Sequence, residues 1–174
     1  MALHIIIDGY NFIRQSNAFS GLDRADIQLG REALIESLAA YKRLKGHRIT
    51  VVFDGIDSPA FSMEKDRVKG IDIRFSRRGE LADAVIKRMA KRLREKALVV
   101  TSDREIADYA AAEGAVSVNS PEFEDKLAMA SYFDAKGAED VAEDAGWEPT
   151  TKKKGPRRRL SKRARRKKIK MQKL

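Results

Sequence analysis

The chain has 174 residues, enough for one domain with its own core and a shorter appendage. It contains no cysteine, which excludes disulfides and thiolate metal sites, and its two histidines, His4 and His47, cannot make a zinc site by themselves. The apolar start has no basic lead-in and is interrupted by Asp8. We therefore expect neither a signal peptide nor a membrane span, and we predict a cytoplasmic protein.

The net charge of +10 is unevenly distributed along the chain. Fourteen Lys and Arg residues and no acid lie between Lys152 and Leu174, which leaves 22 basic against 26 acidic residues in the rest of the chain. The body is therefore mildly acidic. Only the C-terminal segment has the density of positive charge that attracts a polyanion.

The first third of the chain predicts the order strand, loop, helix, strand. Residues 3–7 form a short apolar run typical of a strand buried on both faces, and a polar loop is expected over 12–25. Apolar residues at three- and four-residue steps then predict a helix over 27–45, which Gly46 is placed to end. A second apolar strand is predicted over 49–53.

The remainder of the body continues the same alternation. In order we predict an irregular stretch over 56–63, a half-exposed strand over 71–75 with a loop over 76–79, a helix over 80–94, a strand over 97–101, a helix over 104–113, a short strand over 115–118 and a helix over 120–133. This alternation of strands and helices is typical of an α/β fold with right-handed crossovers.

Each of the three apolar strands leads into an aspartate, namely Asp8, Asp54 and Asp103. Because the carboxyl ends of parallel strands meet at one edge of a sheet, we expect these side chains to face one crevice. Gathered carboxylates repel unless protons or a cation neutralise them, and Mg²⁺ and Mn²⁺ prefer oxygen ligands. The sequence therefore predicts a metal site. Taken singly, each aspartate is also explained as a turn former or helix cap, above all Asp103.

Two further residues are candidates for the same crevice. Glu80 and Asp83 are three residues apart, hence on one face of the predicted helix, and we favour Asp83 as the fourth acid. The alternative for Glu80 is a favourable charge in the first helical turn. Asn11 would add an uncharged amide near Asp8 that can orient a water, a carboxylate or a substrate oxygen.

Several side chains near this edge are candidates for contact with a nucleic acid. Tyr10 can stack on a base, although an aromatic residue beside a strand also fits the core. Arg77, Arg78 and Arg104 can contact phosphates, or they are ordinary surface arginines.

The C-terminal part divides into a linker over 136–151 and a basic tail over 152–174. The tail cannot bury a core, so we predict that it is disordered alone and that 161–174 becomes helical on a polyphosphate partner. RNA is the favoured partner, with a solubility appendage as the alternative. The tail cations taken as RNA-binding are Lys153, Arg157, Arg158, Arg159, Arg163, Arg165 and Arg166.

Four motifs together resemble the YacP-like NYN-domain proteins of the PIN-like nuclease superfamily. They are Ile5–Asn11 (IIIDGYN), Val51–Gly55 (VVFDG), Ala82-Asp83 and Val99–Asp103 (VVTSD), and the resemblance spans Leu3 to about Phe133. Family members often carry a second acid after the Ala-Asp pair. Ala84 stands there in this chain, so Glu80 or Asp108 would have to substitute.

The resemblance implies a PIN-like three-layer α/β/α fold with a central, mainly parallel sheet over residues 1–135. It also implies a metal-dependent endoribonuclease acting on single-stranded RNA, with Mg²⁺ or Mn²⁺ bound by Asp8, Asp83 and Asp103, with Asp54 as a further acid and Asn11 as their companion. The implied partners are mRNA, as part of its processing or decay, on the ribosome or free, or ribosomal RNA.

Other functions fit the sequence less well. The main alternative is a non-catalytic RNA- or ribosome-binding factor with a degenerate PIN-like pocket. A receiver-like phospho-switch would need an acidic pair after the first strand and a lysine ending the last one. Classical nucleotide binding would need a Gly-rich phosphate loop after a strand.

Overall fold

The computed structural model describes residues 3–55, 65–136 and 161–174. The stretch over 56–63, predicted to be irregular, and residues 137–151 of the predicted linker lie outside these ranges. None of the helices within them is both long and apolar enough to cross a membrane.

Six strands form one sheet in the order β3-β4-β2-β1-β5-β6. All neighbours are parallel except β3 and β4, which pair antiparallel. The strands are β1 (His4–Asp8), β2 (Arg48–Phe53), β3 (Lys65–Val68), β4 (Ile71–Phe75), β5 (Ala97–Val100) and β6 (Val116–Val118). The predicted strands are all present, and β1 lies at the centre between β2 and β5.

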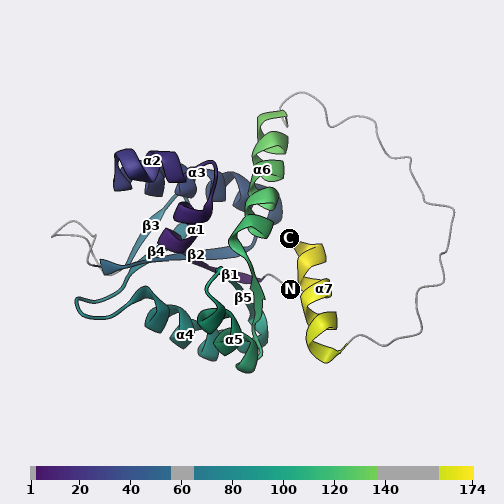
Figure 1. The fold of residues 1–174 in the computed structure, drawn as a ribbon. Helices are drawn as coiled ribbons and strands as arrows, with labels where there is room; N and C mark the ends of the chain where they lie inside the picture. Colours follow the sequence, from purple (N-terminus) through teal and green to yellow (C-terminus); the bar gives the residue numbers. More distant parts are fainter. Residues whose placement is uncertain (1–2, 56–64, 137–160) are drawn as a thin grey trace, which may run out of the picture.

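Helices cover both faces of the sheet, so the predicted three-layer α/β fold with a mostly parallel sheet is confirmed (Figure 1). The layer that contains α1, α3 and α6 packs on one face, and α4 and α5 pack on the other. The helices are α1 (Gly9–Gln15), α2 (Ser20–Ala25), α3 (Ile27–Lys45), α4 (Ala82–Leu93), α5 (Arg104–Ala112), α6 (Ser120–Lys136) and α7 (Lys162–Lys173), with a 3₁₀ turn η2 (Arg94–Lys96).

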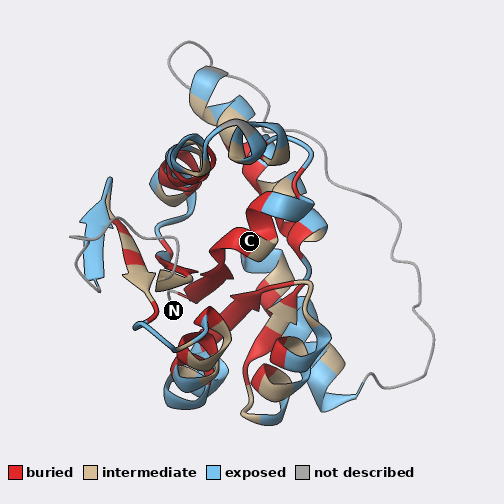
Figure 2. Ribbon diagram, turned by 60° about the vertical axis from the view of Figure 1, so that its left-hand side comes forward, coloured by how far each residue is buried: buried red, intermediate tan, exposed pale blue. Residues whose placement is uncertain are grey.

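The central strand shows why the apolar runs are continuous. Ile5 and Ile7 pack into the core under α1, α3 and α6, whereas Ile6 packs into the core under α4 and α5. Successive side chains of a strand point to opposite faces, so a strand covered on both faces needs apolar residues at every position. Figure 2 shows this buried centre with exposed outer helix faces.

One prediction about the surroundings of the sheet was wrong, and one strand was not predicted. The polar stretch after β1 is not a loop but contains α1, which Asp8 caps, and α2. Strand β3 was missed because all four of its residues are exposed and lack an apolar alternation. The sequence cue for this strand is Gly70, at the turn that joins β3 to β4. In the structure Lys69 and Gly70 have positive φ angles, 50° and 80°, as tight hairpins require.

The C-terminus also differs from expectation, because residues 162–173 form α7 against the body. Leu174 is only 4% exposed and belongs to the core. The Tyr41 hydroxyl donates to the Leu174 carbonyl at 3.3 Å, and Lys170 Nζ donates to the Ala97 carbonyl at 2.8 Å. Apolar packing of Leu174, hydrogen bonds and ion pairs thus all join α7 to the body.

Helix α7 lies at the amino ends of the strands. Ala97 is the first residue of β5, and His47, which bonds the Lys173 carbonyl at 3.0 Å, directly precedes β2. The predicted RNA-binding residues Lys153, Arg157, Arg158 and Arg159 lie outside the described residues.

Candidate functional site

Asp8 is the most deeply buried acid at the carboxyl edge of the sheet. It ends β1, is 8% exposed, and accepts a hydrogen bond from the Asn11 N–H at 3.4 Å. Burial, above all, and the negative charges of Asp83, Asp54 and Asp103 together raise the pKa of Asp8 to about 7. The Asn11 hydrogen bond opposes this shift. The fold therefore brings the four aspartates within electrostatic reach of one another.

Asp54 and Asp103 are each tied to the start of a helix. Asp54 Oδ1 accepts the N–H of Ala82, the first residue of α4, at 2.7 Å. Asp103 caps α5, accepting from the N–H groups of Glu105 at 2.7 Å and Ile106 at 3.3 Å. The helix-cap alternative for Asp103 is therefore correct, and it coexists with a place in the acidic cluster because backbone donors orient carboxylates without neutralising them.

Asp83 approaches the cluster from the first turn of α4. Burial raises its pKa, as do the charges of Asp103, Asp54 and Glu105, while Lys87 opposes the shift. Lys87 in turn donates to Glu105. Sequence reasoning missed both Lys87 and Glu105. Lys87 lies four residues after Asp83, on the same helix face, which is the signal that was available.

Asn11 connects three segments at this edge. Its side-chain oxygen accepts from the Ser102 N–H at 3.1 Å and from the Ser120 hydroxyl at 3.3 Å, and the Ser120 N–H donates to the Ser102 hydroxyl at 3.2 Å. Asn11 therefore links the residues after β1 to those after β5 and to the start of α6. These bonds fix the segment that carries Asp8 relative to the segment that carries Asp103.

The two residues considered as substitutes for the missing acid have other partners. Glu80 accepts a hydrogen bond from Arg88, which lowers the pKa of Glu80. The Asp108 side chain is 79% exposed and lies 3.9 Å from Arg163 of α7. Glu105 is the additional acid that acts on Asp83.

The buried position of Tyr10 contradicts the prediction that its ring stacks on a base. Its side chain is 3% exposed, its ring lies 5.0 Å from that of Phe53, and the Arg31 guanidinium lies 5.2 Å from the Tyr10 ring and donates to its hydroxyl. Both faces are thus occupied by protein. The core role that the sequence allowed as the alternative is the correct one.

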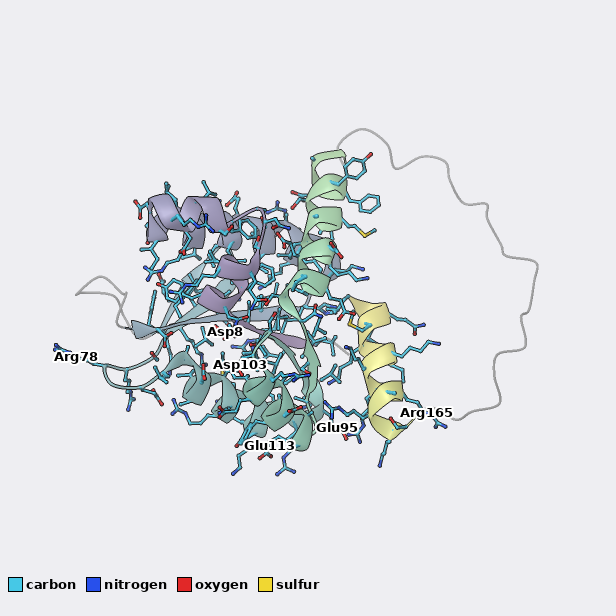
Figure 3. The ribbon with its side chains drawn as sticks, in the orientation of Figure 1. Asp8, Arg78, Glu95, Asp103, Glu113 and Arg165 are labelled. Carbon is cyan, nitrogen blue, oxygen red and sulfur yellow. The ribbon has the colours of Figure 1, made fainter. Side chains whose placement is uncertain are left out.

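The predicted arginine contacts fall at two separate places. Arg77 and Arg78 are exposed in the loop after β4, and Arg104 is exposed at the start of α5, next to Asp103. Arg163 and Arg166 of α7 instead face Asp108 and Glu95, and Arg165 is exposed. In Figure 3 Arg78 and Arg165 lie on opposite sides of Asp8 and Asp103.

The donor chemistry of the cluster suits a hard divalent cation. Burial first, and then the charges of the neighbouring carboxylates, raise the pKa values of Asp8 and Asp83. Ionising these groups is therefore costly here, and a bound cation would remove that cost. In the conformation described, no group of three or more His, Asp or Glu side chains within residues 3–55, 65–136 and 161–174 is arranged to hold a metal ion. The side chains would have to converge for an ion to bind.

Comparison with known proteins extends the resemblance noted in the sequence. The family model "YacP-like NYN domain" matches residues 5–173. Uncharacterized protein YacP of Bacillus subtilis (strain 168) is 30% identical over 103 residues, which are 57% of this chain and 59% of that protein. The match thus spans less than two thirds of the relative's length.

Two crystal structures share the fold. Rae1 (YacP) from Bacillus subtilis has a TM-score of 0.67 at 24% identity, covering 79% of this chain and 80% of its own. A point mutant of the same Bacillus subtilis protein has a TM-score of 0.64 at 22% identity, covering 80% and 86%. With the family match over almost the whole sequence, these findings show that the chain belongs to the YacP-like NYN domain family of PIN-like nucleases.

Proposed function

We propose that this protein is a metal-dependent endoribonuclease that hydrolyses phosphodiester bonds of single-stranded RNA. One observation carries the proposal: four aspartates from separate strand ends and a helix start act on one another, and the pKa of Asp8 rises to about 7. Such a cluster costs folding free energy unless cations or protons neutralise it. We propose Asp8, Asp83 and Asp103 as ligands of Mg²⁺ or Mn²⁺, with Asp54 as a further acid of the pocket.

The chain's own groups would prepare the site for this chemistry. When bound, a divalent ion supplies Lewis-acid activation of a water and neutralises charge at the scissile phosphate. The backbone N–H groups at the starts of α4 and α5 hold Asp54 and Asp103 in fixed orientations. Asp8 releases its proton near pH 7, so its ionised form, the one able to bind a cation, predominates above that value. Asn11 acts as a positioning residue through Ser102 and Ser120.

Single-stranded RNA is the proposed substrate, either mRNA, on the ribosome or free, or ribosomal RNA. The fourteen basic residues after Thr151 support this choice, because dense positive charge attracts phosphates. Arg104, exposed beside Asp103, suits a phosphate contact close to the acids. Since α7 lies at the opposite edge of the sheet, its cations would recruit RNA and not hold it at the acids.

The test is cleavage of a labelled single-stranded RNA by the full chain with Mn²⁺, with Mg²⁺ and with EDTA. An Asp8→Asn, Asp103→Asn double variant is the comparison, and its folding is checked by circular dichroism. We expect cleavage that requires the metal and is lost in the double variant. If RNA is bound but not cut, free or on ribosomes, the protein is instead an RNA- or ribosome-binding factor.

A further inference from the structure

A strongly basic cavity lies beside the acidic cluster, on the side of β4 and α4. It has a volume of about 530 Å³ and is lined by five cationic side chains against one acid, Glu80, which pairs with Arg88. The five cations are Lys65, Arg74, Arg77, Arg78 and Arg88. Outside the C-terminal tail the chain has more acidic than basic residues, so this concentration of positive charge is local.

The positive surface continues along α4. A neighbouring hollow of about 390 Å³ shares Arg74 and Arg88 with the first and adds Lys91 and Arg92. We call the two together the cationic trough. It is long enough to involve the sheet edge at β3, the loop after β4 and most of α4.

Repulsion between the cations of the trough acts on Arg74. Burial lowers the pKa of Arg74, and the charges of Arg92 and Arg48 lower it further, while Asp72 opposes the shift. Asp72 is itself paired with Arg48 at 2.9 Å. A chain of phosphates would relieve this repulsion along the whole trough, and polyphosphates are the ligands that such rows of Lys and Arg recognise.

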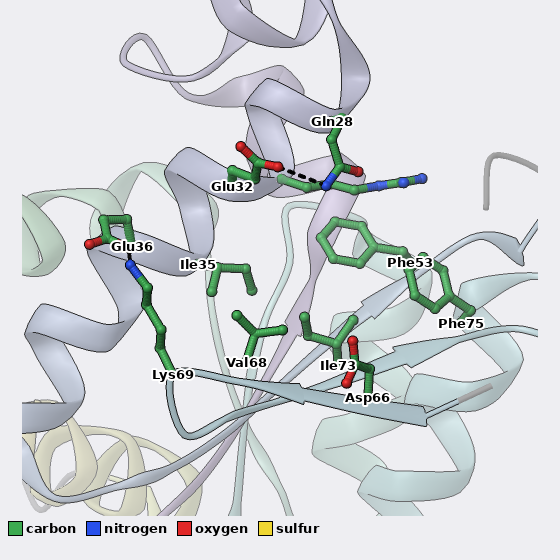
Figure 4. A pocket seen from close by; sticks show the side chains of 11 residues that line it. Gln28, Glu32, Ile35, Glu36, Phe53, Asp66, Val68, Lys69, Ile73 and Phe75 are labelled. Atoms are coloured by element: carbon green, nitrogen blue, oxygen red, sulfur yellow. Dashed lines mark hydrogen bonds and ion pairs between the residues drawn. The ribbon is translucent and has the colours of Figure 1, made fainter. Parts of the chain in front are cut away.

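Phe75 lies between the trough and a second cavity. It is half-buried and lines both, and in the second cavity, which Figure 4 shows, its ring stacks on that of Phe53 with 5.8 Å between centroids. The Arg31 guanidinium lies 5.4 Å from the same ring. Phe53 and Arg31 are the same two groups that enclose Tyr10, so Phe75 packs within the protein's own aromatic cluster and is not assigned to a base.

The trough is joined to the acids by close backbone contacts. The Ser76 hydroxyl accepts the Gly55 N–H at 2.9 Å, and a Cβ on Gly55 would lie 1.9 Å from the Ser76 carbonyl oxygen. The loop that carries Arg77 and Arg78 is therefore packed against the residue after Asp54. On its other side the same loop leads to Ala82, whose N–H bonds Asp54.

We infer that the cationic trough is the path of single-stranded RNA to the acids, with its phosphates on Arg74, Arg77, Arg78 and Arg88. The inference rests on the proposed function only for the fate of the RNA at the acids. Near the acids, the RNA would be bound by residues of β4, of the loop after it and of α4. These elements lie on the opposite side of the molecule from α7.

Binding of a fluorescein-labelled oligouridylate to the full chain in EDTA tests the trough separately from cleavage. The variant is Arg74→Gln with Arg78→Gln, and the control is Lys45→Gln with Lys96→Gln, two exposed lysines outside the trough with the same change in charge. We expect the trough variant to weaken binding about tenfold at low salt and to reduce the slope of log Kd against log salt by about 1.4, or about 0.7 for each lost phosphate contact. The control should stay within about twofold of the original chain.

The outcomes separate the two proposals. If the trough variant binds like the original chain while metal-dependent cleavage is intact, the trough is overturned and the nuclease stands. If it loses binding but no condition yields cleavage, the trough stands and the nuclease falls. Equal loss in the lysine control would also contradict the assignment.

Discussion

Asp54 Oδ1 accepts the backbone N–H of Ala82 at 2.7 Å, although 28 positions separate the two residues. The bond joins the end of β2 to the first residue of α4, which is the helix that carries Asp83. One hydrogen bond thereby orients one acid of the cluster and sets the position of another.

Two Asp54 variants should therefore differ in stability although both lose activity. Asp54→Ala removes the acceptor at the start of α4 and should lower the free energy of unfolding by about 1 kcal/mol, the usual cost of a lost cap. Asp54→Asn keeps an oxygen acceptor and should lose less, yet both variants should lose RNA cleavage. Urea unfolding and cleavage assays measure the two effects. Equal destabilisation by Asn and Ala would mean that the bond to Ala82 contributes little.

Asp8 should make stability depend on pH when no divalent cation is present. Its folded pKa, about 7, lies above the ordinary value of 3.8, so the folded state holds a proton that the unfolded state releases. The resulting stabilisation is complete below pH 3.8 and is lost as the pH rises through 7. Thermal unfolding in EDTA between about pH 5 and 8, compared with Asp8→Asn, covers this loss. A pH dependence that is unchanged in Asp8→Asn would assign it to other groups.

Added Mn²⁺ should reverse that trend. A cation competes with the proton on Asp8, so the rise in Tm caused by Mn²⁺ should be larger at about pH 8 than at about pH 6. The Asp8→Asn, Asp83→Asn variant serves as control and should show little stabilisation at either pH. A Tm that does not respond to Mn²⁺ in the original chain would argue against a metal at this cluster.

Asn11 should matter for stability as well as for the site. Asn11→Ala leaves the Ser102 N–H and the Ser120 hydroxyl without their acceptor and should cost about 1–3 kcal/mol. Ser120→Ala removes only one of these donors and should cost less. Chemical denaturation of both variants measures the difference, and a larger loss in Ser120→Ala would show that Asn11 is not the centre of this network.

Lys170 should couple the docking of α7 to alkaline pH. Burial lowers the pKa of Lys170 to about 8, and Arg166 lowers it too, whereas Glu95 opposes the shift. Because the folded pKa lies below the ordinary 10.5, the unfolded state binds more protons between these values, and stability should rise as the pH increases from 8 to 10.5. Lys170→Met keeps the apolar stem and should abolish this rise. Hydrogen exchange of α7 amides measures docking directly, and exchange that is equally fast in Lys170→Ala and the original chain would show that the contact is unimportant.

Local sequence patterns were sufficient to predict the strands that lead into the acids. The predicted helix over 27–45 agrees with α3, and Gly46 ends it with φ of 67°. The apolar runs that lead into Asp8, Asp54 and Asp103 form β1, β2 and β5 because strands covered on both faces must be apolar throughout. From these runs alone, the sequence determined a parallel sheet with aspartates at its carboxyl edge, and its motifs determined the family.

Only the tertiary structure decided which side chains meet. The order β3-β4-β2-β1-β5-β6 sets β4 beside β2, and so packs the basic loop after β4 against Gly55. Glu105 and Lys87 lie at the acidic cluster, the Tyr10 side chain lies in the core, and α7 packs at the far edge of the sheet through Leu174. These outcomes depend on contacts between residues far apart in the chain, whose energies no local periodicity contains.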